Sequence, residues 1–435
     1  MFILAYSIYT AHQTVRHKGE RHMKTFLAAI PFFDSDISVC AYRLNSRSGK
    51  KLLGMLDDEP SVSDAVSSPG LDLVKSLGVE PLTGGSPLFI DINEYHLLMR
   101  IPILLGIQPE QLVCVLPNSI NSDAAVLERC RELEELGFNI AIDGLLDGHT
   151  KNPLFEIIDY LIIDIADFTL DNKFIETFKA LAKLKKIVLS NIPDMDMFNT
   201  LAGIPNTLYS GDFFSHPITK GVTKISPLKI NALALMNRIN EEDFDLGDIA
   251  NTIERDPSLS ISLLRFINTI MPRKIESIRN SVTILGQKEV KRWATAAISI
   301  QLADDKPNEI TKLSLIRARF AENLAGAFKM GVFAPGLFMM GLFSLLDIIL
   351  DVPMEEAAKE VALDENVRAA LVDKSGDFYH IMEFILAYEH ANWDNIAIRM
   401  VKHDLDLDEI TDAYVDALEW YKKLLEAIEG EEKAK

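Results

Sequence analysis

The chain has 435 residues, of which 48% are hydrophobic and 25% charged, and its formal net charge is -20 at pH 7. This length exceeds the usual size of one hydrophobic core, so we expect two or three domains, and the composition argues against extensive disorder. The acidic balance argues against nucleic acid as a general partner. Three scattered cysteines, Cys40, Cys114 and Cys130, favour a reducing cytoplasm over a disulfide framework or a zinc site.

The two ends of the chain differ from its body. Residues 1–22 place an apolar stretch before a basic cluster, the reverse of a secretory signal, and Met23 resembles a natural start. We predict an extension over 1–22, disordered or the product of a mis-assigned start codon, and an acidic tail over 429–435. The longest uncharged run, between Lys329 and Asp347, predicts a buried helix and not a membrane span.

Residues 23–215 alternate between strand and helix patterns. The stretch Phe26–Ile30 predicts a strand ended by Pro31, and Ile37–Leu44 predicts its hairpin partner. Further strands are expected at 88–92, 112–116, 137–143, 160–165, 187–190 and 207–214, and helices at 122–136 (with Asn121 or Ser122 as N-cap), 153–158 and 173–185. Strands separated by helices at short intervals indicate a parallel sheet, and we predict a closed TIM-like α/β barrel.

Polar residues stand at the C-terminal ends of the predicted strands: Asp91, Asn118, Asp143, Asp164, Ser190 and Ser210. In a barrel of this kind these ends face the active site, although strand-end turns favour the same residue types. Asp143 is therefore either a catalytic or metal-binding carboxylate or the remnant of one.

Five short segments carry a family resemblance. They are Ala28–Asp34 (family Ala-Arg-Gln-Pro-Ile-Phe-Asp), Tyr42–Arg47 (Tyr-Glu-Leu-Leu-Tyr-Arg), Asp143–Leu145 (Asp-Asp-Phe), Ile162–Asp164 (Lys-Ile-Asp) and Ser210–Phe214 (Gln-Gly-Tyr-Phe-Phe). Through them residues 23–215 resemble the EAL domain, the cyclic di-GMP phosphodiesterase fold, in the variant that precedes an HDOD domain in bacterial signalling proteins. The family's enzymes cleave the dinucleotide with two metal ions held by carboxylates and an asparagine.

Carried over position by position, the resemblance implies a degenerate metal site. Arg43 replaces the signature glutamate, and Asp91 stands at the asparagine position. The segment Val115–Pro117, where a further glutamate is expected, has no carboxylate. Asp143 is retained, but Gly144 replaces its aspartate partner.

The remaining positions are equally incomplete. Ile162 replaces the lysine, Asp164 remains, and the late glutamate falls near Ser190 or Pro193. Hard divalent cations need several oxygen ligands, usually anionic, in a fixed geometry. We therefore predict no catalytic residues, no metal, no cofactor and no enzyme activity.

Arg43 also suggests what replaces the metals. Its guanidinium is expected to neutralise Asp91, Asp143 and Asp164 without ions. Arg47 stands where the family holds a phosphate-contacting arginine, so binding of cyclic di-GMP without cleavage is an alternative.

The C-terminal half changes to helical periodicity, after a linker predicted at 216–226. An all-α domain is expected over 227–428, with helices that include one starting after Asp256, one stopped by Gly286 and one over 335–350. The segments Asp256–Asn268 and Ser277–Gly286 resemble the HDOD domain, which is related to HD phosphohydrolases but lacks their metal-binding His-Asp pair. In this chain Ser344-Leu345 stand where that pair falls.

Together these resemblances imply a non-catalytic cytoplasmic signalling protein of bacteria. It would act through contacts with other signalling proteins in cyclic di-GMP-linked regulation of motility or biofilm. The alternatives are a cyclic di-GMP receptor without hydrolysis and a phosphodiesterase with an atypical metal site. Neither the partner protein nor the oligomeric state follows from the sequence.

Overall fold

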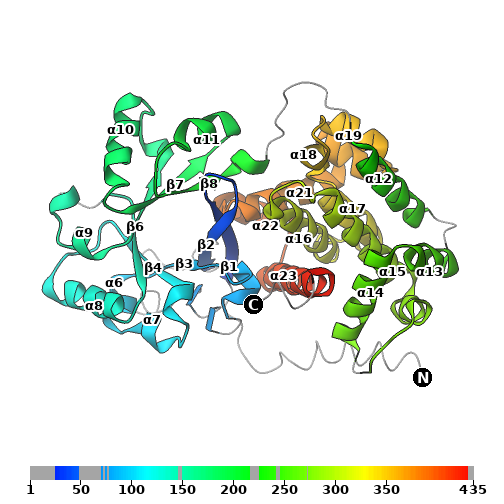
Figure 1. Ribbon diagram of the computed structural model, residues 1–435, viewed down its shortest axis with the longest axis horizontal. Coiled ribbons are helices and arrows are strands. Elements are labelled where there is room, and N and C mark those ends of the chain that lie inside the picture. Colours follow the sequence, from blue (N-terminus) through cyan, green and yellow to red (C-terminus); the bar gives the residue numbers. More distant parts are fainter. Residues whose placement is uncertain are drawn as a thin grey trace.

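Figure 1 shows the computed structural model of the chain, which describes residues 25–48, 70–71, 74–75, 78–145, 149–215, 225–241, 245–271 and 273–429. The predicted extension, the linker and the acidic tail lie wholly or largely outside these residues.

The N-terminal half is a closed barrel of eight strands in sequence order. The strands are β1 (Thr25–Phe33), β2 (Val39–Ser48), β3 (Leu88–Asp91), β4 (Leu112–Pro117), β5 (Asn139–Asp143), β6 (Tyr160–Asp164), β7 (Lys186–Ile192) and β8 (Thr207–Gly211). Strands β2 to β8 pair in parallel, whereas β1 is antiparallel to both neighbours. The predicted α/β barrel and its opening hairpin are confirmed.

The expectation that Pro31 ends the first strand is wrong, because β1 continues to Phe33. Pro31 pairs with Tyr42, and the Tyr42 N–H donates away from β1 to the Pro87 carbonyl, 3.0 Å away. In such a pair the proline nitrogen also faces away from β2, toward the open edge of β1, so no ladder hydrogen bond is lost.

Short helices and turns surround the barrel. They are α5 (Glu80–Thr83), α6 (Glu94–Leu98), α7 (Ile101–Leu104), η1 (Pro109–Gln111), α8 (Ala124–Glu135), η2 (His149–Lys151), α9 (Leu154–Ile157), η3 (Ile165–Asp167), α10 (Asn172–Leu181), α11 (Met195–Leu201) and η4 (Asp212–Ser215). The predicted N-cap of α8 is wrong by one or two residues. Asp123 caps this helix instead, because its carboxylate accepts hydrogen bonds from the amides of Ala125 and Val126, each at 2.9 Å.

The barrel interior is a separate small core. Its buried members are Phe32, Ala41, Phe89, Val113, Val115, Ala141, Ile162 and Val188. They alternate along the strands with residues that pack outward against the helices, which is the period-two pattern of a filled barrel.

The C-terminal half is helical, as predicted. Its elements are α12 (Pro227–Asn240), α13 (Leu246–Arg255), α14 (Pro257–Ile270), α15 (Ile278–Leu302), α16 (Asn308–Leu324), η5 (Gly331–Phe333), α17 (Ala334–Leu342), α18 (Leu346–Leu350), α19 (Met354–Glu360), α20 (Glu365–Arg368), η6 (Ala369–Asp373), α21 (Gly376–Glu389), α22 (Trp393–His403) and α23 (Leu407–Glu429). The Asp256 carboxylate accepts from the Leu259 amide at the start of α14, and α15 breaks at Gly286, where φ is 79°. Among the described residues no helix combines the length and apolarity needed to cross a bilayer.

The single helix expected over 335–350 is divided into α17 and α18. Ser344 lies at the break, and its hydroxyl donates to the Gly341 carbonyl at 2.7 Å. A serine side chain that bonds to the backbone in this way competes with continued helix.

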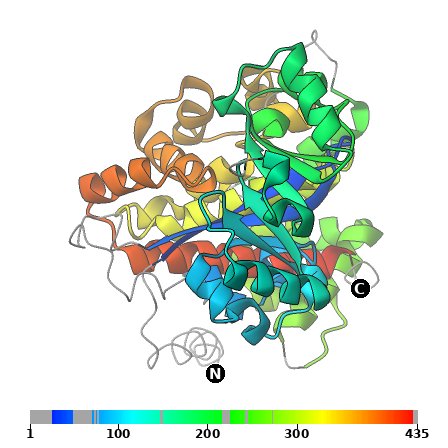
Figure 2. The ribbon, with the colours of Figure 1, turned by 90° about the vertical axis from the view of Figure 1, so that its left-hand side faces the viewer.

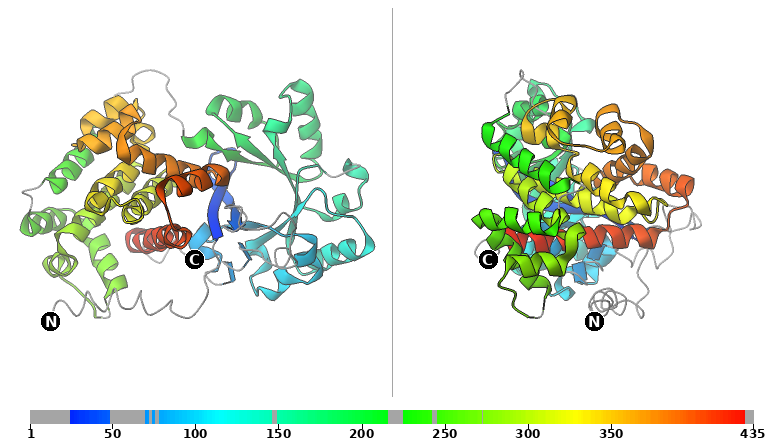
Figure 3. Two further views of the ribbon diagram at one scale, coloured as in Figure 1. Left: turned by 180° about the vertical axis from the view of Figure 1, so that it is seen from behind. Right: turned by 90° about the vertical axis from the view of Figure 1, so that its right-hand side faces the viewer.

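The helical half covers the open edge of β1. Helices α21 and α23 contact β1, and the red α23 runs beside the blue strands in Figures 2 and 3. Strand β1 meets β8 through one residue pair, Phe33 with Tyr209, which leaves the rest of this edge without a strand partner. The Leu27 amide donates to the Tyr388 hydroxyl at 3.4 Å, and the Tyr414 hydroxyl hydrogen-bonds the Ala29 backbone. The helices thus satisfy an edge that would otherwise be exposed.

Candidate functional site

Three residues predicted for the site meet at the mouth of the barrel. Arg43 Nη2 lies 2.8 Å from Asp91 Oδ1 and 2.6 Å from Asp143 Oδ2, so one nitrogen binds two carboxylates. Strands β2, β3 and β5 supply the three residues, and strand order brings them together although 100 residues separate Arg43 from Asp143. This is the ion pairing that the sequence hypothesis expects for Arg43, at two of its three aspartates.

Arg43 is charged and largely shielded from water. Its side chain is 19% exposed, and its Nε is buried without a hydrogen-bond partner among the described residues. Burial lowers the pKa of Arg43, but Asp91 and Asp143 outweigh it and raise that pKa above its usual value. The guanidinium therefore occupies the space between the carboxylates as a permanent cation.

The residues at the mouth do not fit a two-metal site. A divalent cation between Asp91 and Asp143 would have to displace the Arg43 guanidinium and would meet its positive charge. Among the described residues no group of three histidine, cysteine, aspartate or glutamate side chains is arranged to hold a metal ion. No catalytic step can be derived through metals at these residues.

Asp164 does not join the Arg43 group. One of its oxygens accepts from Asn191 Nδ2 at 2.5 Å, and the other accepts from the Ala166 amide at 2.9 Å. Asn191 has a left-handed backbone, with φ of 63°, at the irregular end of β7. The irregularity requires Gly211 on β8, because a Cβ there would lie 2.2 Å from the Ile192 carbonyl oxygen. Sequence reasoning missed Asn191.

Three other positions at or near the strand ends, Ile162, Ser190 and Gly144, have no carboxylate. Ile162 packs in the barrel interior with Val115, and the Ser190 hydroxyl donates to the Ile163 carbonyl at 3.3 Å. Gly144 has φ of 102°, and a Cβ there would lie 2.6 Å from Asn118 Nδ2. A residue with a side chain would be strained in this left-handed backbone and would require the Asn118 side chain to move.

The helical half forms a roof over the mouth. A cavity of about 550 Å³ lies between the halves and is lined by Arg43, Asp143 and Asp164 on one side and by residues of α16, α21 and α23 on the other. Its charged lining comprises five acidic side chains (Asp143, Asp164, Asp212, Glu309, Glu389) and three basic ones (Arg43, Lys312, Arg317), besides His390. An acidic surplus of this kind repels phosphate groups.

Tyr42, next to Arg43, anchors this roof. Its hydroxyl donates to Glu309 Oε2 at 2.7 Å, and the Lys312 ammonium lies 3.7 Å from the centre of its ring. Burial, together with the Glu309 charge, raises the pKa of Tyr42 and keeps it a neutral donor. Glu309 and Lys312 were not predicted as site residues, because 267 positions separate Tyr42 from Glu309 and no sequence pattern links them.

Arg47, the candidate phosphate contact, lies outside this cavity lining. Its Nη1 is 3.5 Å from Asp394 Oδ1 on α22, and both side chains are well exposed. The residue therefore contributes to the contact between the two halves.

In the helical half, Ser344 lies where the resemblance placed the lost His-Asp pair. Its hydroxyl accepts from Arg317 Nη1 at 3.2 Å, and Arg317 also forms a bidentate pair with Glu389. His390 follows Glu389 and lies 2.8 Å from Asp212 of the barrel. His380 contacts Glu383 at 3.4 Å, whereas the Nε2 of His403 is buried without a hydrogen-bond partner among the described residues.

Comparisons with known proteins agree with this architecture. The HDOD domain family matches residues 225–391. The uncharacterized protein YuxH of Bacillus subtilis is 29% identical over 423 residues, which are 93% of this chain and 100% of that protein. The cyclic di-GMP phosphodiesterase CdgJ of Vibrio cholerae is 25% identical over 404 residues, which are 91% of this chain and 92% of that protein.

A solved EAL domain protein from Listeria monocytogenes aligns with a TM-score of 0.36 and 16% identity, over 44% of this chain and 88% of its own. YuxH and CdgJ align over more than nine-tenths of this chain, so the similarity includes the barrel as well as the matched HDOD domain. A closed eight-stranded barrel thus precedes a helical region whose residues 225–391 match the HDOD domain, which is the domain order of the EAL-HDOD arrangement that the resemblance implies.

Proposed function

We propose that this protein is a non-catalytic regulator in cyclic di-GMP-linked signalling and acts through contacts with other proteins. The observation that carries the proposal is the clamp made by Arg43 on Asp91 and Asp143. A guanidinium at this point neutralises the carboxylates that metal ions would otherwise use, and it is held there by both of them.

Two further observations support the proposal. Val115 belongs to the segment Val115–Pro117, where the resemblance expects a ligand glutamate, and Ile162 stands at the lysine position. Both are buried apolar residues of the barrel interior. The helical domain roofs the mouth with Glu309, Lys312 and Tyr414, so a substrate would have to enter a cavity bounded by both domains. Loss of the reactive groups with retention of both cores is what selection for binding without chemistry would leave.

The competing function is hydrolysis of cyclic di-GMP, which the name of the Vibrio cholerae relative favours. The test is an assay of the full chain at high protein concentration with Mg²⁺ or Mn²⁺, beside the variant Asp143→Asn. We expect no metal-dependent product from either protein. Product from the unchanged chain that disappears in Asp143→Asn would overturn the proposal.

A second competing function is binding of cyclic di-GMP without cleavage. The acidic surplus in the cavity argues against a ligand with two phosphates. Calorimetry with cyclic di-GMP at near-millimolar concentration is expected to show no saturable heat. A saturable signal that weakens in Arg43→Ala but not in Arg47→Ala would place the nucleotide in this cavity and support the receptor function instead.

The role in the cell can be tested by complementation. A strain that lacks the gene is expected to recover its regulatory behaviour with either the unchanged chain or the Asp143→Asn variant, provided both accumulate equally. Failure of Asp143→Asn alone would show that this carboxylate has a chemical role, contrary to the proposal.

A further inference from the structure

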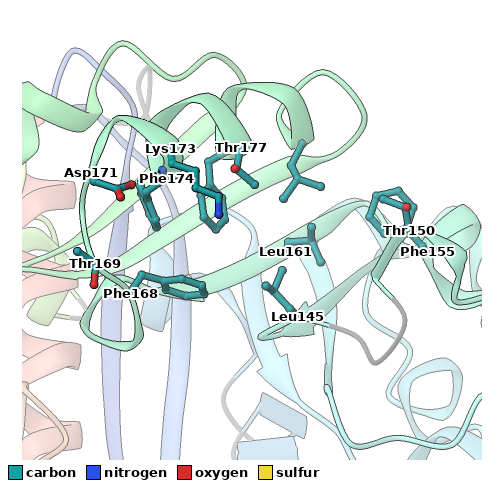
Figure 4. Close-up of a pocket in the computed structure, with 12 residues that line it drawn as sticks. Leu145, Thr150, Phe155, Leu161, Phe168, Thr169, Asp171, Lys173, Phe174 and Thr177 are labelled. Carbon is teal, nitrogen blue, oxygen red and sulfur yellow. Dashed lines mark hydrogen bonds between the residues drawn. The ribbon is translucent and has the colours of Figure 1, made fainter.

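A second cavity lies on the outer side of the barrel, near the ends of β5 and β6, and shares no lining residue with the cavity at the mouth. It has a volume of about 400 Å³ and an almost wholly apolar lining that includes Leu145, Phe155, Leu161, Phe168, Phe174 and Phe178. In Figure 4 Phe174 lies on α10 at one side of the cavity, and Leu145 and Leu161 lie beside β5 and β6 at the other.

The cavity exists because one barrel helix is very short. Helix α9 has 4 residues, whereas α8 before it has 12 and α10 after it has 10. In a (β/α) barrel each helix covers the outer faces of the neighbouring strands. One helical turn leaves space beside the flank of β6, between Leu161 and the aromatic face of α10.

The shape of the lining favours a narrow occupant. Leu161, Phe174 and Phe178 are buried although they line the cavity, so its apolar surface is recessed and does not form a flat patch. The rings of Phe168, Phe174 and Phe178 pack together, with centroids 4.3 to 5.7 Å apart. A slender acyl chain can enter such a recess, whereas a helix of another protein needs an open apolar face.

The rim of the cavity carries the positive charge of Lys173, which favours an anionic group on the ligand. Lys173 and Thr177 lie four residues apart on α10, on one face of the helix, and both line the cavity (Figure 4). Lys173 has no ion-pair partner among the residues that the structure describes. The one acidic residue in the lining, Asp171, uses a carboxylate oxygen to cap α10 by accepting from the Phe174 amide at 2.8 Å.

We propose that this cavity binds a medium-chain fatty acid. The acyl chain lies among the phenylalanines, and the carboxylate contacts the Lys173 ammonium and the Thr177 hydroxyl at the rim. The site is separate from the barrel mouth, so the inference goes beyond the proposed function and does not depend on it.

Calorimetry of the full chain with decanoate tests the site, with decylamine as a probe of the same length and opposite charge. We expect saturable binding of decanoate and weaker binding of decylamine. Lys173→Glu should weaken decanoate about tenfold and reverse the preference, because an attractive partly exposed charge becomes repulsive. Lys179→Glu is the matched control on the same helix. It makes the same change in net charge, lies outside the cavity lining and should leave both affinities unchanged.

A variant that fills the recess provides an independent test. Thr177 is exposed on α10, so Thr177→Trp should fold, keep its melting temperature and lose decanoate binding. The proposal is overturned if the unchanged chain shows no saturable binding below the micelle-forming concentration, or if decanoate and decylamine bind alike. It is also overturned if the unchanged chain sediments as a dimer and Thr177→Trp converts it to a monomer without changing decanoate binding. The cavity would then be a contact between two copies of the chain.

Discussion

Arg43 in the barrel and Arg317 in the helical domain both hold carboxylates near positions where the family resemblances placed metal ligands, but their surroundings differ. Arg317 is 6% exposed and uses Nε and Nη2 in a bidentate pair with Glu389, at 2.7 to 3.0 Å. Arg43 is 19% exposed and binds Asp91 and Asp143 through one nitrogen, with a buried Nε that has no hydrogen-bond partner among the described residues.

The difference indicates that the two arginines form two kinds of ion pair. Arg317 ties α16 to the end of α21 through a satisfied buried pair, which is a structural element of the helical core. Arg43 ties three strands together at a mouth that water still reaches, and its unused donor leaves the clamp incomplete. We therefore expect the two arginines to differ in their contribution to stability, and two measurements test this.

The largest effect is expected for Arg317→Met. Removing one partner of a buried pair leaves the Glu389 charge uncompensated, at a cost of about 3–5 kcal/mol in the free energy of unfolding. Urea unfolding measures the change. The double variant Arg317→Met, Glu389→Met should recover much of the loss, because apolar residues can replace a buried pair with little cost. A single variant as stable as the unchanged chain would remove the distinction between the two sites.

A smaller effect is expected for Arg43→Ala. It leaves Asp91 and Asp143 facing each other without a cation, but both are about half exposed, so we expect a loss of about 1–2 kcal/mol. Arg47→Ala, which breaks a longer and more exposed pair, should cost under about 0.5 kcal/mol. Equal losses in thermal melts of the two variants would show that Arg43 is an ordinary surface arginine and not a clamp.

A further effect, smaller than that of Arg43→Ala, concerns the contact between the two regions, where His390 meets Asp212. The hydrogen bond to Asp212 raises the pKa of His390, against burial and with help from the charges of Asp212 and Glu389, while Arg317 opposes the shift. A raised pKa in the folded state means that this stabilisation is fully present below the unfolded value of about 6.5 and is lost as pH rises through the folded value. Both side chains are about half exposed, so the effect should stay under about 1 kcal/mol.

The measurement for this contact is the difference in unfolding free energy between the unchanged chain and Asp212→Asn. We expect the difference to be larger at about pH 5.5 than at about pH 8.5, where His390 is neutral. A difference that is constant with pH, or that grows toward alkaline pH, would show that the protonated histidine does not hold the domains together.

Local rules predicted most of the elements and failed where long-range contacts decide. The barrel strands follow from short apolar runs, and the start of α14 follows from the Asp256 cap. Pro31 was read as a stop, because the sequence does not reveal that its nitrogen faces an edge without a strand partner. The break between α17 and α18 depends on the Ser344 hydroxyl, which sequence periodicity does not register.

The site shows the same division. Arg43, Asp91 and Asp143 were predicted together, because parallel strand ends meet at one rim of a barrel. Asp164 is expected in the same group, but its carboxylate accepts from Asn191 and from the Ala166 amide instead. Glu309 and Lys312 come from the other half of the chain, so no local pattern could place them beside Tyr42.

By itself the sequence determined the barrel and the helical domain that follows it, since apolar periodicity is a local property. Only the tertiary structure decided that one Arg43 nitrogen joins two aspartates and that tyrosines of the helical half satisfy the edge of β1. The cavity beside the short α9 likewise depends on how the neighbouring elements pack. The physical reason is that these features depend on distances between residues far apart in the chain, which folding fixes and composition does not.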